Sequence, residues 1–186
     1  ETKPSLTTGP QKGFYHCFVC DANGTALGFL MNYQNLSFVE AIKELAKMVG
    51  VAVPKTKEDR VASKEKNDLK SLLSQVSKHY EKNLKNSTIA IEYFKNRGID
   101  GKTATQYALG FAQDSWDDVL NRFGKTEKDK KQLLACGLLT EKDNGGYFDK
   151  FRNRLMFPIR NNRGEVLGFG GRVIARTIKD NEPKYL

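Results

Sequence analysis

The sequence is poor in the residues and patterns that define several classes of protein. It contains three cysteines, two histidines and one tryptophan in 186 residues. No apolar run approaches the roughly 18 residues of a membrane-spanning helix, so we expect no membrane segment. The polar start, ETKPSLTTGPQKG, lacks the apolar stretch of a signal peptide, and we expect residue 1 to be a cut point. Without a secretory signal, we expect no disulfide framework.

Sets of catalytic side chains are also scarce. We find no Ser/His/Asp combination for nucleophilic catalysis. The later part of the chain has no Asp-x-Asp or clustered carboxylates within an apolar strand, so the two-metal chemistry of polymerases is not expected within it. The adjacent Asp117 and Asp118 are interpreted as helix capping. We expect His79 to be structural or exposed, and Cys136 to be a small buried apolar residue.

The chain does have positive charge, with a net value of +9. Residues 150–186 contain nine Lys and Arg against three Asp and Glu, and six of the nine are Arg. A planar guanidinium binds phosphate in a forked geometry, so this bias favours a face for nucleic acid or nucleotides. Composition alone leaves a solvated basic surface as the alternative.

Cys17 and Cys20 form a Cys-x-x-Cys pair followed by the turn residues from Asp21 to Gly24. Such a knuckle brings two thiolates to one zinc ion. A redox dithiol and a purely structural pair remain alternatives. We do not count His16 as a ligand, because its side chain would point to the opposite face of a strand. The chain holds no second Cys/His pair, so a zinc site requires partners before residue 1.

Residues 1–53 predict a small unit. We expect a short strand at 13–20, a short helix at 26–33 and a helix that starts at the capping box of Ser37 and Glu40 and ends at Gly50. A unit this small usually needs a metal to stabilise it. Residues 54–67 are charged and are interpreted as a linker. The alternative is that their second half is the exposed start of the next helix.

Residues 68–186 predict a helical region followed by a β-hairpin, which makes the fold class α+β. The caps of three helices are expected at Ser87, at Ser115 with Asp118, and at Thr126 with Asp129. A long first helix is marked by an apolar stripe. Its members are Leu69, Leu72, Leu73, Val76, Tyr80 and Leu84.

The runs RLMFPIR and EVLGFGGRVI are expected to form the hairpin through the turn NNRG. Pro158 places the first run at a sheet edge or a bulge. Gly168, Gly170 and Gly171 fit a close approach of another backbone or a ligand. Arg152 and Arg154 are expected on one face of the first strand, whereas solvent-facing arginines on a twisted hairpin are the alternative.

Several stretches together resemble one family. PSLTTGPQKGFYHCFVCDANGTALGFLMNYQNLSFVEAIKELA resembles the zinc-binding domain of bacterial DNA primases. The segments YFKNRGI, FDKFRNRLMFPIRNNRGEVLGFGGRVI and PKYL resemble the first part of the family's RNA polymerase domain. The match covers nearly the whole chain in the right order. It implies a zinc-ribbon-type unit at 1–53, a linker at 54–67, and at 68–186 the subdomain that precedes a Toprim fold.

The resemblance also implies site residues. The family's zinc ligands are a Cys-x-x-His pair, expected just before Glu1, and a Cys-x-x-Cys pair that matches Cys17 and Cys20. The catalytic carboxylates and their magnesium are expected after Leu186, so we expect no catalytic residue in this fragment and no primer synthesis by it alone. The remaining positions match the template and nucleotide path. They are Arg97, Arg152, Arg154, Arg172, Lys184 and Tyr185.

The function implied by the resemblance is synthesis of short RNA primers on single-stranded DNA during replication. The implied partners are the template, the primer, nucleoside triphosphates and, through a C-terminal region, the replicative helicase. The implied location is the bacterial cytoplasm. The alternative class is a non-catalytic zinc-ribbon module that binds nucleic acid. The Arg-rich hairpin that ends in PKYL favours the primase.

Overall fold

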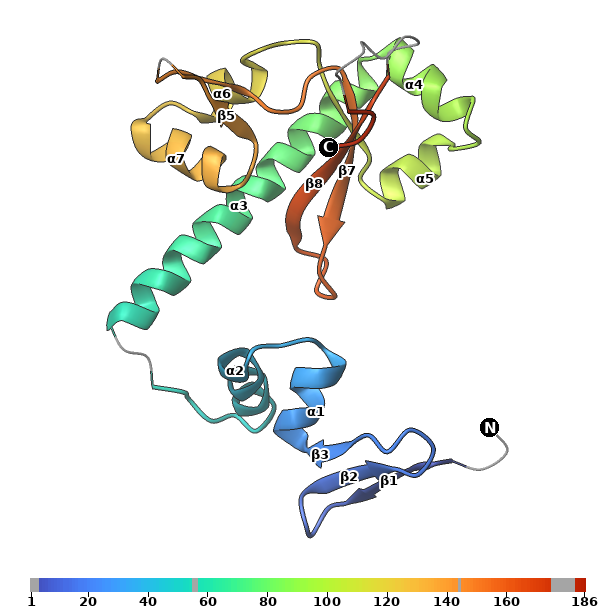
Figure 1. Ribbon diagram of the computed structural model, residues 1–186, viewed down its shortest axis with the longest axis vertical. Helices are drawn as coiled ribbons and strands as arrows, with labels where there is room; N and C mark the ends of the chain where they lie inside the picture. Colours follow the sequence, from blue (N-terminus) through green and yellow to red (C-terminus); the bar gives the residue numbers. More distant parts are fainter. Residues whose placement is uncertain (1–3, 55–56, 144, 175–182) are drawn as a thin grey trace. The chain divides into compact units, whose positions relative to one another are not determined.

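A computed structural model describes residues 4–54, 57–143, 145–174 and 183–186 (Figure 1). The chain divides into two compact units, Glu1–Arg60 and Val61–Leu186. Helices and small antiparallel sheets occur in both, which confirms the α+β expectation. Among the described helices, none combines the length and hydrophobicity that crossing a bilayer requires.

The first unit, unit 1, is a three-stranded antiparallel ribbon followed by two helices. The strands pair in the order β1-β2-β3. The Thr25 side chain caps the first helix, and Ser37 with Glu40 forms the expected capping box of the second. The elements are β1 (Leu6–Gly9), β2 (Phe14–Cys17), β3 (Asn23–Thr25), α1 (Ala26–Tyr33) and α2 (Phe38–Met48).

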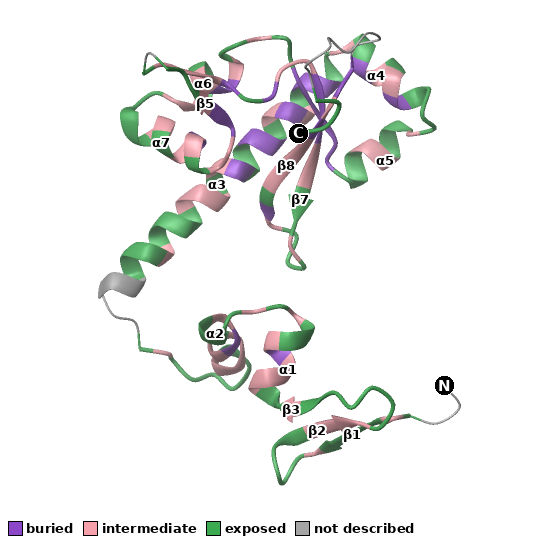
Figure 2. Ribbon diagram, viewed as in Figure 1, coloured by how far each residue is buried: buried purple, intermediate pink, exposed green. Residues whose placement is uncertain are grey.

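Few side chains of unit 1 are buried. Leu30 and Ala41 are its buried apolar residues within the described part of the chain (Figure 2). Large apolar side chains such as Phe18, Tyr33 and Met48 are 74%, 75% and 64% exposed. Unit 1 therefore has a thin core.

The segment interpreted as a linker is mostly helical. Helix α3 spans Lys57–Lys85, so residues 57–67 form its first turns, and the alternative interpretation was the correct one for this half. The side chains at 60–67 are mainly exposed. An exposed stretch of helix needs no apolar residues at helical spacing, so the sequence does not mark it as a helix. The buried stripe begins later, where Leu73, Val76 and Tyr80 lie at 6% exposure or less.

The second unit, unit 2, arranges short helices and hairpins around α3. Strands β4, β7 and β8 form one antiparallel sheet in that order, and β5 pairs with β6. Helix α5 and the β5–β6 hairpin were not expected from the sequence. The elements after α3 are α4 (Thr88–Lys95), α5 (Gly101–Gln106), β4 (Gly110–Ala112), α6 (Asp118–Phe123), α7 (Glu127–Ala135), β5 (Leu139–Glu141), β6 (Tyr147–Asp149), β7 (Arg154–Arg160) and β8 (Val166–Val173).

The predicted hairpin is β7–β8, with a register shift at Ile159/Arg160. Strand β7 lies in the middle of its sheet, but β4 pairs with only its first three residues. At Pro158, β7 therefore pairs with β8 alone, where Pro158 lies opposite Phe169. Because no strand lies on the other side of β7 at this point, the missing N–H of proline leaves no hydrogen bond to β4 unmade.

Another part of the backbone lies close to the glycines of β8. This is the first of the two predicted reasons for these glycines, the second being a ligand. Gly171 and Leu186 exchange two backbone hydrogen bonds of 2.8 and 2.9 Å, and Val173 N–H donates to Lys184 O at 3.1 Å. A Cβ on Gly171 would lie 2.7 Å from the Phe151 ring, so no larger residue fits there without movement. The final residues are thereby held along β8, with Tyr185 opposite Arg172.

Two clusters of buried side chains form the core of unit 2. The larger packs α3 residues such as Val76 and Tyr80 against Leu133, Leu138 and Met156. The second packs α4 and β4, through Phe94 and Phe111, against Leu155 of β7. Cys136 is half-buried against the larger cluster, and burial raises the pKa of its thiol, as expected for an apolar role.

The expected capping of α6 is wrong in its residues. Asp117 occupies the N-cap position but makes no side-chain capping bond. The buried carboxylate of Asp149 instead accepts the backbone N–H groups of Val119 and Leu120, at 2.7 and 3.0 Å. Asp118 bonds His79 Nε2 at 2.8 Å, which confirms a structural role for this histidine. The box at Thr126 and Asp129 is present as expected.

Candidate nucleic-acid interface

Four of the six predicted nucleic-acid residues lie close together in unit 2, with Arg172 at their centre. The guanidinium carbon of Arg172 lies 5.4 Å from the ring centroid of Tyr93 and 5.4 Å from that of Tyr185. Arg97 lies 5.6 Å from the Tyr93 ring, and the Lys184 Nζ lies 6.0 Å from the Tyr185 ring. These distances fall within the range of cation–π contacts. We call Tyr93, Arg97, Arg172, Lys184 and Tyr185 the Arg172 cluster.

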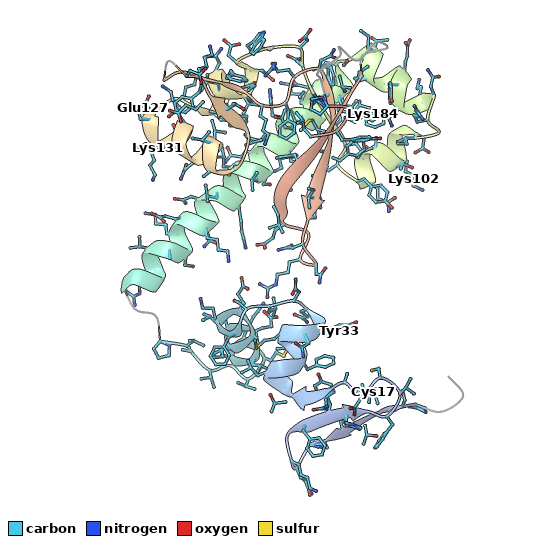
Figure 3. The ribbon with its side chains drawn as sticks, viewed as in Figure 1. Cys17, Tyr33, Lys102, Glu127, Lys131 and Lys184 are labelled. Carbon is cyan, nitrogen blue, oxygen red and sulfur yellow. The ribbon has the colours of Figure 1, made fainter. Side chains whose placement is uncertain are left out.

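Three elements position the Arg172 cluster. Helix α4 carries Tyr93, and Arg97 follows it by four residues, just beyond the helix end. Strand β8 carries Arg172, and the final segment carries Lys184 and Tyr185 (Figure 3 labels Lys184). The antiparallel bridge between Arg172 and Tyr185 sets the side chains beside each other.

The electrostatics of this cluster suit an anion. It holds three cationic side chains, and Arg97, Lys184 and Tyr185 are exposed. Within the described part of the chain, the buried Nε of Arg172 has no hydrogen-bond partner. A buried donor without an acceptor costs about 1–3 kcal/mol. A phosphate oxygen would supply the missing acceptor, and the tyrosine rings would offer faces for a base.

Arg154 lies elsewhere, in the interior. It is 3% exposed, and its Nη1 donates to Pro183 O at 3.0 Å and to Gly171 O at 3.4 Å. These bonds tie the final segment to β8. Arg154 therefore helps to hold the segment that carries Lys184 and Tyr185.

The expectation that Arg152 and Arg154 share a strand face is wrong. Strand β7 begins at Arg154, and Asn153 has φ = 48°, which turns the chain just before it. Arg152 instead lies 3.8 Å from the centroid of the Trp116 ring and 5.2 Å from that of Phe148. Its Nη1 donates to Asp149 O at 2.6 Å.

Sequence reasoning missed Tyr93 and Trp116. Tyr93 precedes Arg97 by four residues on a helix, the spacing at which side chains meet, so this signal was available. Trp116 and Arg152 are far apart in sequence. The strand β6 that brings them together was not expected, so the sequence held no comparable signal.

In unit 1 the two cysteines lie at a tight turn. Asp21, with φ = 58°, turns the chain so that its N–H donates to Cys17 O at 2.9 Å. The Cys17 thiol has its pKa lowered to about 7, chiefly by the backbone N–H of Cys20 and then by the Ser5 hydroxyl, 3.6 Å from Sγ. Such stabilisation of a thiolate fits a zinc ligand.

His16 contacts a carboxylate. Its Nε2 lies 2.8 Å from Asp21 Oδ1. No group of three or more His, Cys, Asp or Glu side chains suited to a metal occurs among the described residues. Cys17 and Cys20 therefore have no third candidate ligand beside them among these residues.

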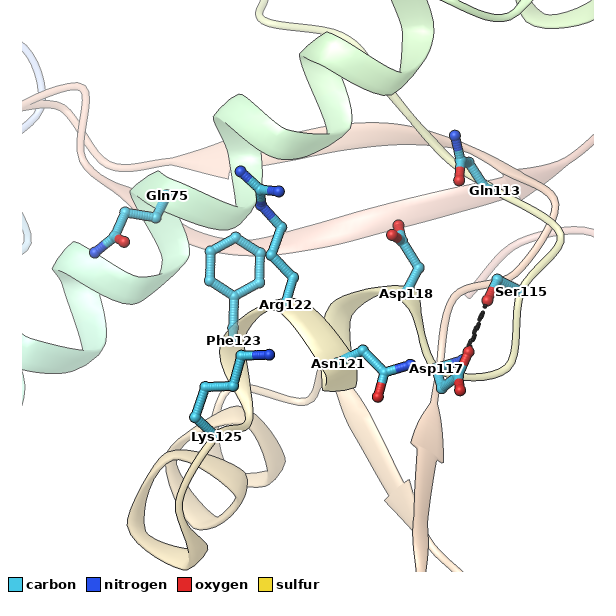
Figure 4. Close-up of a pocket in the computed structure, with 9 residues that line it drawn as sticks. All are labelled: Gln75, Gln113, Ser115, Asp117, Asp118, Asn121, Arg122, Phe123 and Lys125. Carbon is cyan, nitrogen blue, oxygen red and sulfur yellow. Dashed lines mark hydrogen bonds between the residues drawn. The ribbon is translucent and has the colours of Figure 1, made fainter.

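A separate polar cavity of about 750 Å³ lies between α3 and α6 (Figure 4). It contains none of the predicted site residues. Its acidic side chains already have partners, since Asp117 accepts a bond from Ser115 and Asp118 is bonded to His79. We therefore place the candidate interface at the Arg172 cluster.

Comparisons with known proteins show which family the chain belongs to. The model of the N-terminal domain of the DNA primase catalytic core matches residues 79–186, and that of the CHC2 zinc finger matches residues 1–61. These matches define a class of proteins in which a CHC2 zinc finger precedes the N-terminal domain of a primase catalytic core. The chain belongs to the DNA primase family.

Curated relatives include the DNA primases of Pasteurella multocida (strain Pm70) and Escherichia coli (strain K12). They are 39% and 40% identical over 191 residues each, covering 100% of this chain and 32% of theirs. The chain thus spans about a third of the length of these relatives.

Solved structures show the same fold. The DnaG primase catalytic domain bound to ssDNA is 38% identical with a TM-score of 0.62, covering 67% of this chain and 39% of that one. The Aquifex aeolicus primase, with its zinc-binding and RNA polymerase domains, is 32% identical with a TM-score of 0.56, covering 100% of this chain and 44% of that one.

Proposed function

We propose that this chain is the zinc-binding and template-binding part of a primase that synthesises short RNA primers on single-stranded DNA. The carboxylates that bind magnesium for nucleotidyl transfer lie outside residues 1–186, in a Toprim fold of the longer protein. The replicative helicase binds a further C-terminal region. Synthesis takes place in the bacterial cytoplasm, with nucleoside triphosphates as substrates.

One observation carries this proposal. Arg172 lies between two tyrosine rings with its buried Nε unpartnered within the described residues, and Arg97 and Lys184 flank it. Phosphate contacts position a nucleic acid, and aromatic rings stack its bases without regard to sequence. A site that must accept many template sequences needs this combination.

A binding titration tests the role of the cluster. A labelled single-stranded oligonucleotide is titrated with the chain, with Arg172→Ala and with Lys131→Ala, and fluorescence anisotropy is recorded over a range of salt concentrations. Arg172→Ala should weaken binding about 5-fold or more, and lower the salt slope by about 0.7, because one phosphate contact is lost. Lys131 is exposed on α7, so its variant controls for net charge.

Equal affinities for Arg172→Ala and Lys131→Ala would contradict the proposed role. Circular dichroism separates loss of binding from loss of folding. If Arg172→Ala lowers the melting temperature while the affinity per folded molecule stays unchanged, Arg172 is a structural residue.

We further propose that Cys17 and Cys20 are two of four zinc ligands. The tight turn and the lowered pKa of Cys17 support this assignment. In the longer protein, Cys17→Ser and Cys20→Ser should each lower the zinc content measured by mass spectrometry, whereas Cys136→Ser should not. Full zinc content in both variants would exclude the pair as ligands.

A further inference from the structure

Trp116 is the only tryptophan of the chain, and it lies at the surface. Its residue is 61% exposed, although its ring contacts two other side chains. The Arg152 guanidinium lies 3.8 Å from the ring centroid, and the Phe148 ring lies 5.5 Å away at an angle of 60°. We call Trp116, Phe148 and Arg152 the Trp116 platform.

Asp149 connects two members of this platform to the fold. Its N–H donates to Trp116 O at 2.8 Å, and its carbonyl accepts the Arg152 Nη1 at 2.6 Å. Its carboxylate is 2% exposed and binds the first N–H groups of α6. Trp116 is thus fixed by its backbone while its ring remains exposed. A ring that is ordered before binding loses little entropy when a ligand stacks on it.

The platform lies at the same end of the β7–β8 pair as the Arg172 cluster. Arg152 precedes Arg154 by two residues, and Arg154 pairs with Val173, the residue after Arg172. The chain before β7 also contacts the end of β8, because Ile174 N–H donates to Asn153 O at 3.3 Å. A single strand bound at Arg172 would meet the platform if it continued around this end of the β7–β8 pair.

We propose that the Trp116 platform stacks a base of the single-stranded nucleic acid whose phosphates the Arg172 cluster binds. This inference rests on the proposed function and adds a residue to its site. The Arg152 guanidinium lies over the indole ring and holds it in place by cation–π attraction. The exposed part of the same ring stacks against the base. Asp114 and Asp117 flank Trp116 and repel phosphate, so the contact is made through the base.

The packing does not explain the exposure of this ring. A tryptophan that serves only the core buries most of its surface, and the nearby core is already filled by buried residues such as Val119 and Leu138. Phe148, which is half-buried, is the member of the platform that serves packing.

Intrinsic fluorescence tests the proposal directly, because every tryptophan signal of the chain comes from Trp116. The 186-residue chain is titrated with a short oligothymidylate and with an abasic oligonucleotide of the same length. We expect strong quenching with the bases present and little with the abasic backbone, even at concentrations where anisotropy shows that both are bound.

Two variants complete the test, with affinities from the anisotropy of a labelled oligothymidylate. Trp116→Ala should weaken binding about 5- to 100-fold, the loss of one base–aromatic stack. Tyr107→Ala removes a similarly exposed ring (60%) outside the platform and should leave affinity unchanged. Circular dichroism checks that both variants are folded.

Unchanged fluorescence on binding, or equal quenching by the abasic oligonucleotide, would overturn the stacking role of Trp116. Docking of another protein on this platform would give the first of these results. If Arg172→Ala still weakens binding in that case, the proposed function stands and only the platform is excluded. If the wild-type chain binds no oligonucleotide at all, both are excluded.

Discussion

The two units differ in how many apolar side chains they bury and in their net charge. Unit 1 buries two apolar residues, whereas unit 2 buries twenty, within the described part of the chain. Their charges differ too: residues 4–54 carry three Lys against three Asp and Glu, and residues 61–186 carry 24 Lys and Arg against 16 Asp and Glu. We therefore expect unit 1 to gain stability from a bound zinc ion, whereas unit 2 has a core of its own and an excess of positive charge suited to phosphate.

Leu133→Ala should show the largest effect and should affect unit 2 alone. Leu133 is fully buried in the larger core cluster. A cavity at such a site costs about 3–5 kcal/mol in the free energy of unfolding. Urea denaturation followed by circular dichroism measures this loss. Leu167→Ala, at a residue 53% exposed, is the control, and equal losses in the two variants would contradict the assigned core.

Gly110→Ala should follow, with a loss of about 1–3 kcal/mol from overpacking. The new Cβ would lie 2.5 Å from Tyr80 Cβ and 2.9 Å from the Tyr80 carbonyl carbon, so α3 and β4 must separate. Gly168→Ala is the matched control, since nothing lies within 4 Å of its new Cβ. Thermal unfolding of the two variants compares them, and a Gly110→Ala protein as stable as wild type would mean that α3 and β4 pack less closely.

Asp149→Asn should change how the stability of unit 2 depends on pH, and this effect should be smaller than the two losses above. Burial is the main cause that raises the pKa of Asp149 in the folded protein. The folded state thus binds this proton more tightly than the unfolded state, and the contribution of Asp149 to stability falls as pH rises from about 4 through the raised pKa.

The variant cannot titrate, so this fall should be absent from its stability curve. Urea unfolding at a series of pH values between about 4 and 7 gives the comparison. Identical pH profiles for wild type and Asp149→Asn would show that this carboxyl group has the same pKa in both states.

The sequence predicted what depends on local chemistry. The capping boxes at Ser37 and Thr126, the stripe on α3 and the β7–β8 hairpin involve residues near one another in the chain, and the structure has them. The start of α3 was interpreted as a linker because an exposed helix shows no apolar period. The α6 cap was assigned to neighbouring Asp117 and Asp118, whereas the acceptor is Asp149, which lies on β6.

The site residues likewise divide into those that the sequence identifies and those that depend on tertiary packing. The resemblance identifies Arg97, Arg172, Lys184 and Tyr185, and the four-residue spacing from Arg97 points to Tyr93. The contact between Tyr93 and Arg172 appears only when α4 and β8 are placed together. The burial of Arg154 likewise follows from the return of the final segment along β8. Contacts of this long range depend on tertiary packing, which no local pattern records.

Cross-linking tests the central claim, that unit 2 presents the Arg172 cluster to single-stranded nucleic acid. An oligonucleotide that carries photoreactive iodouracil is irradiated with the chain, and the attached peptides are identified by mass spectrometry. We expect cross-links at Tyr93 and Tyr185, with Trp116 as a further site, and none on α7. Cross-links confined to α7, or to the hairpin turn at residues 161–164, would contradict it.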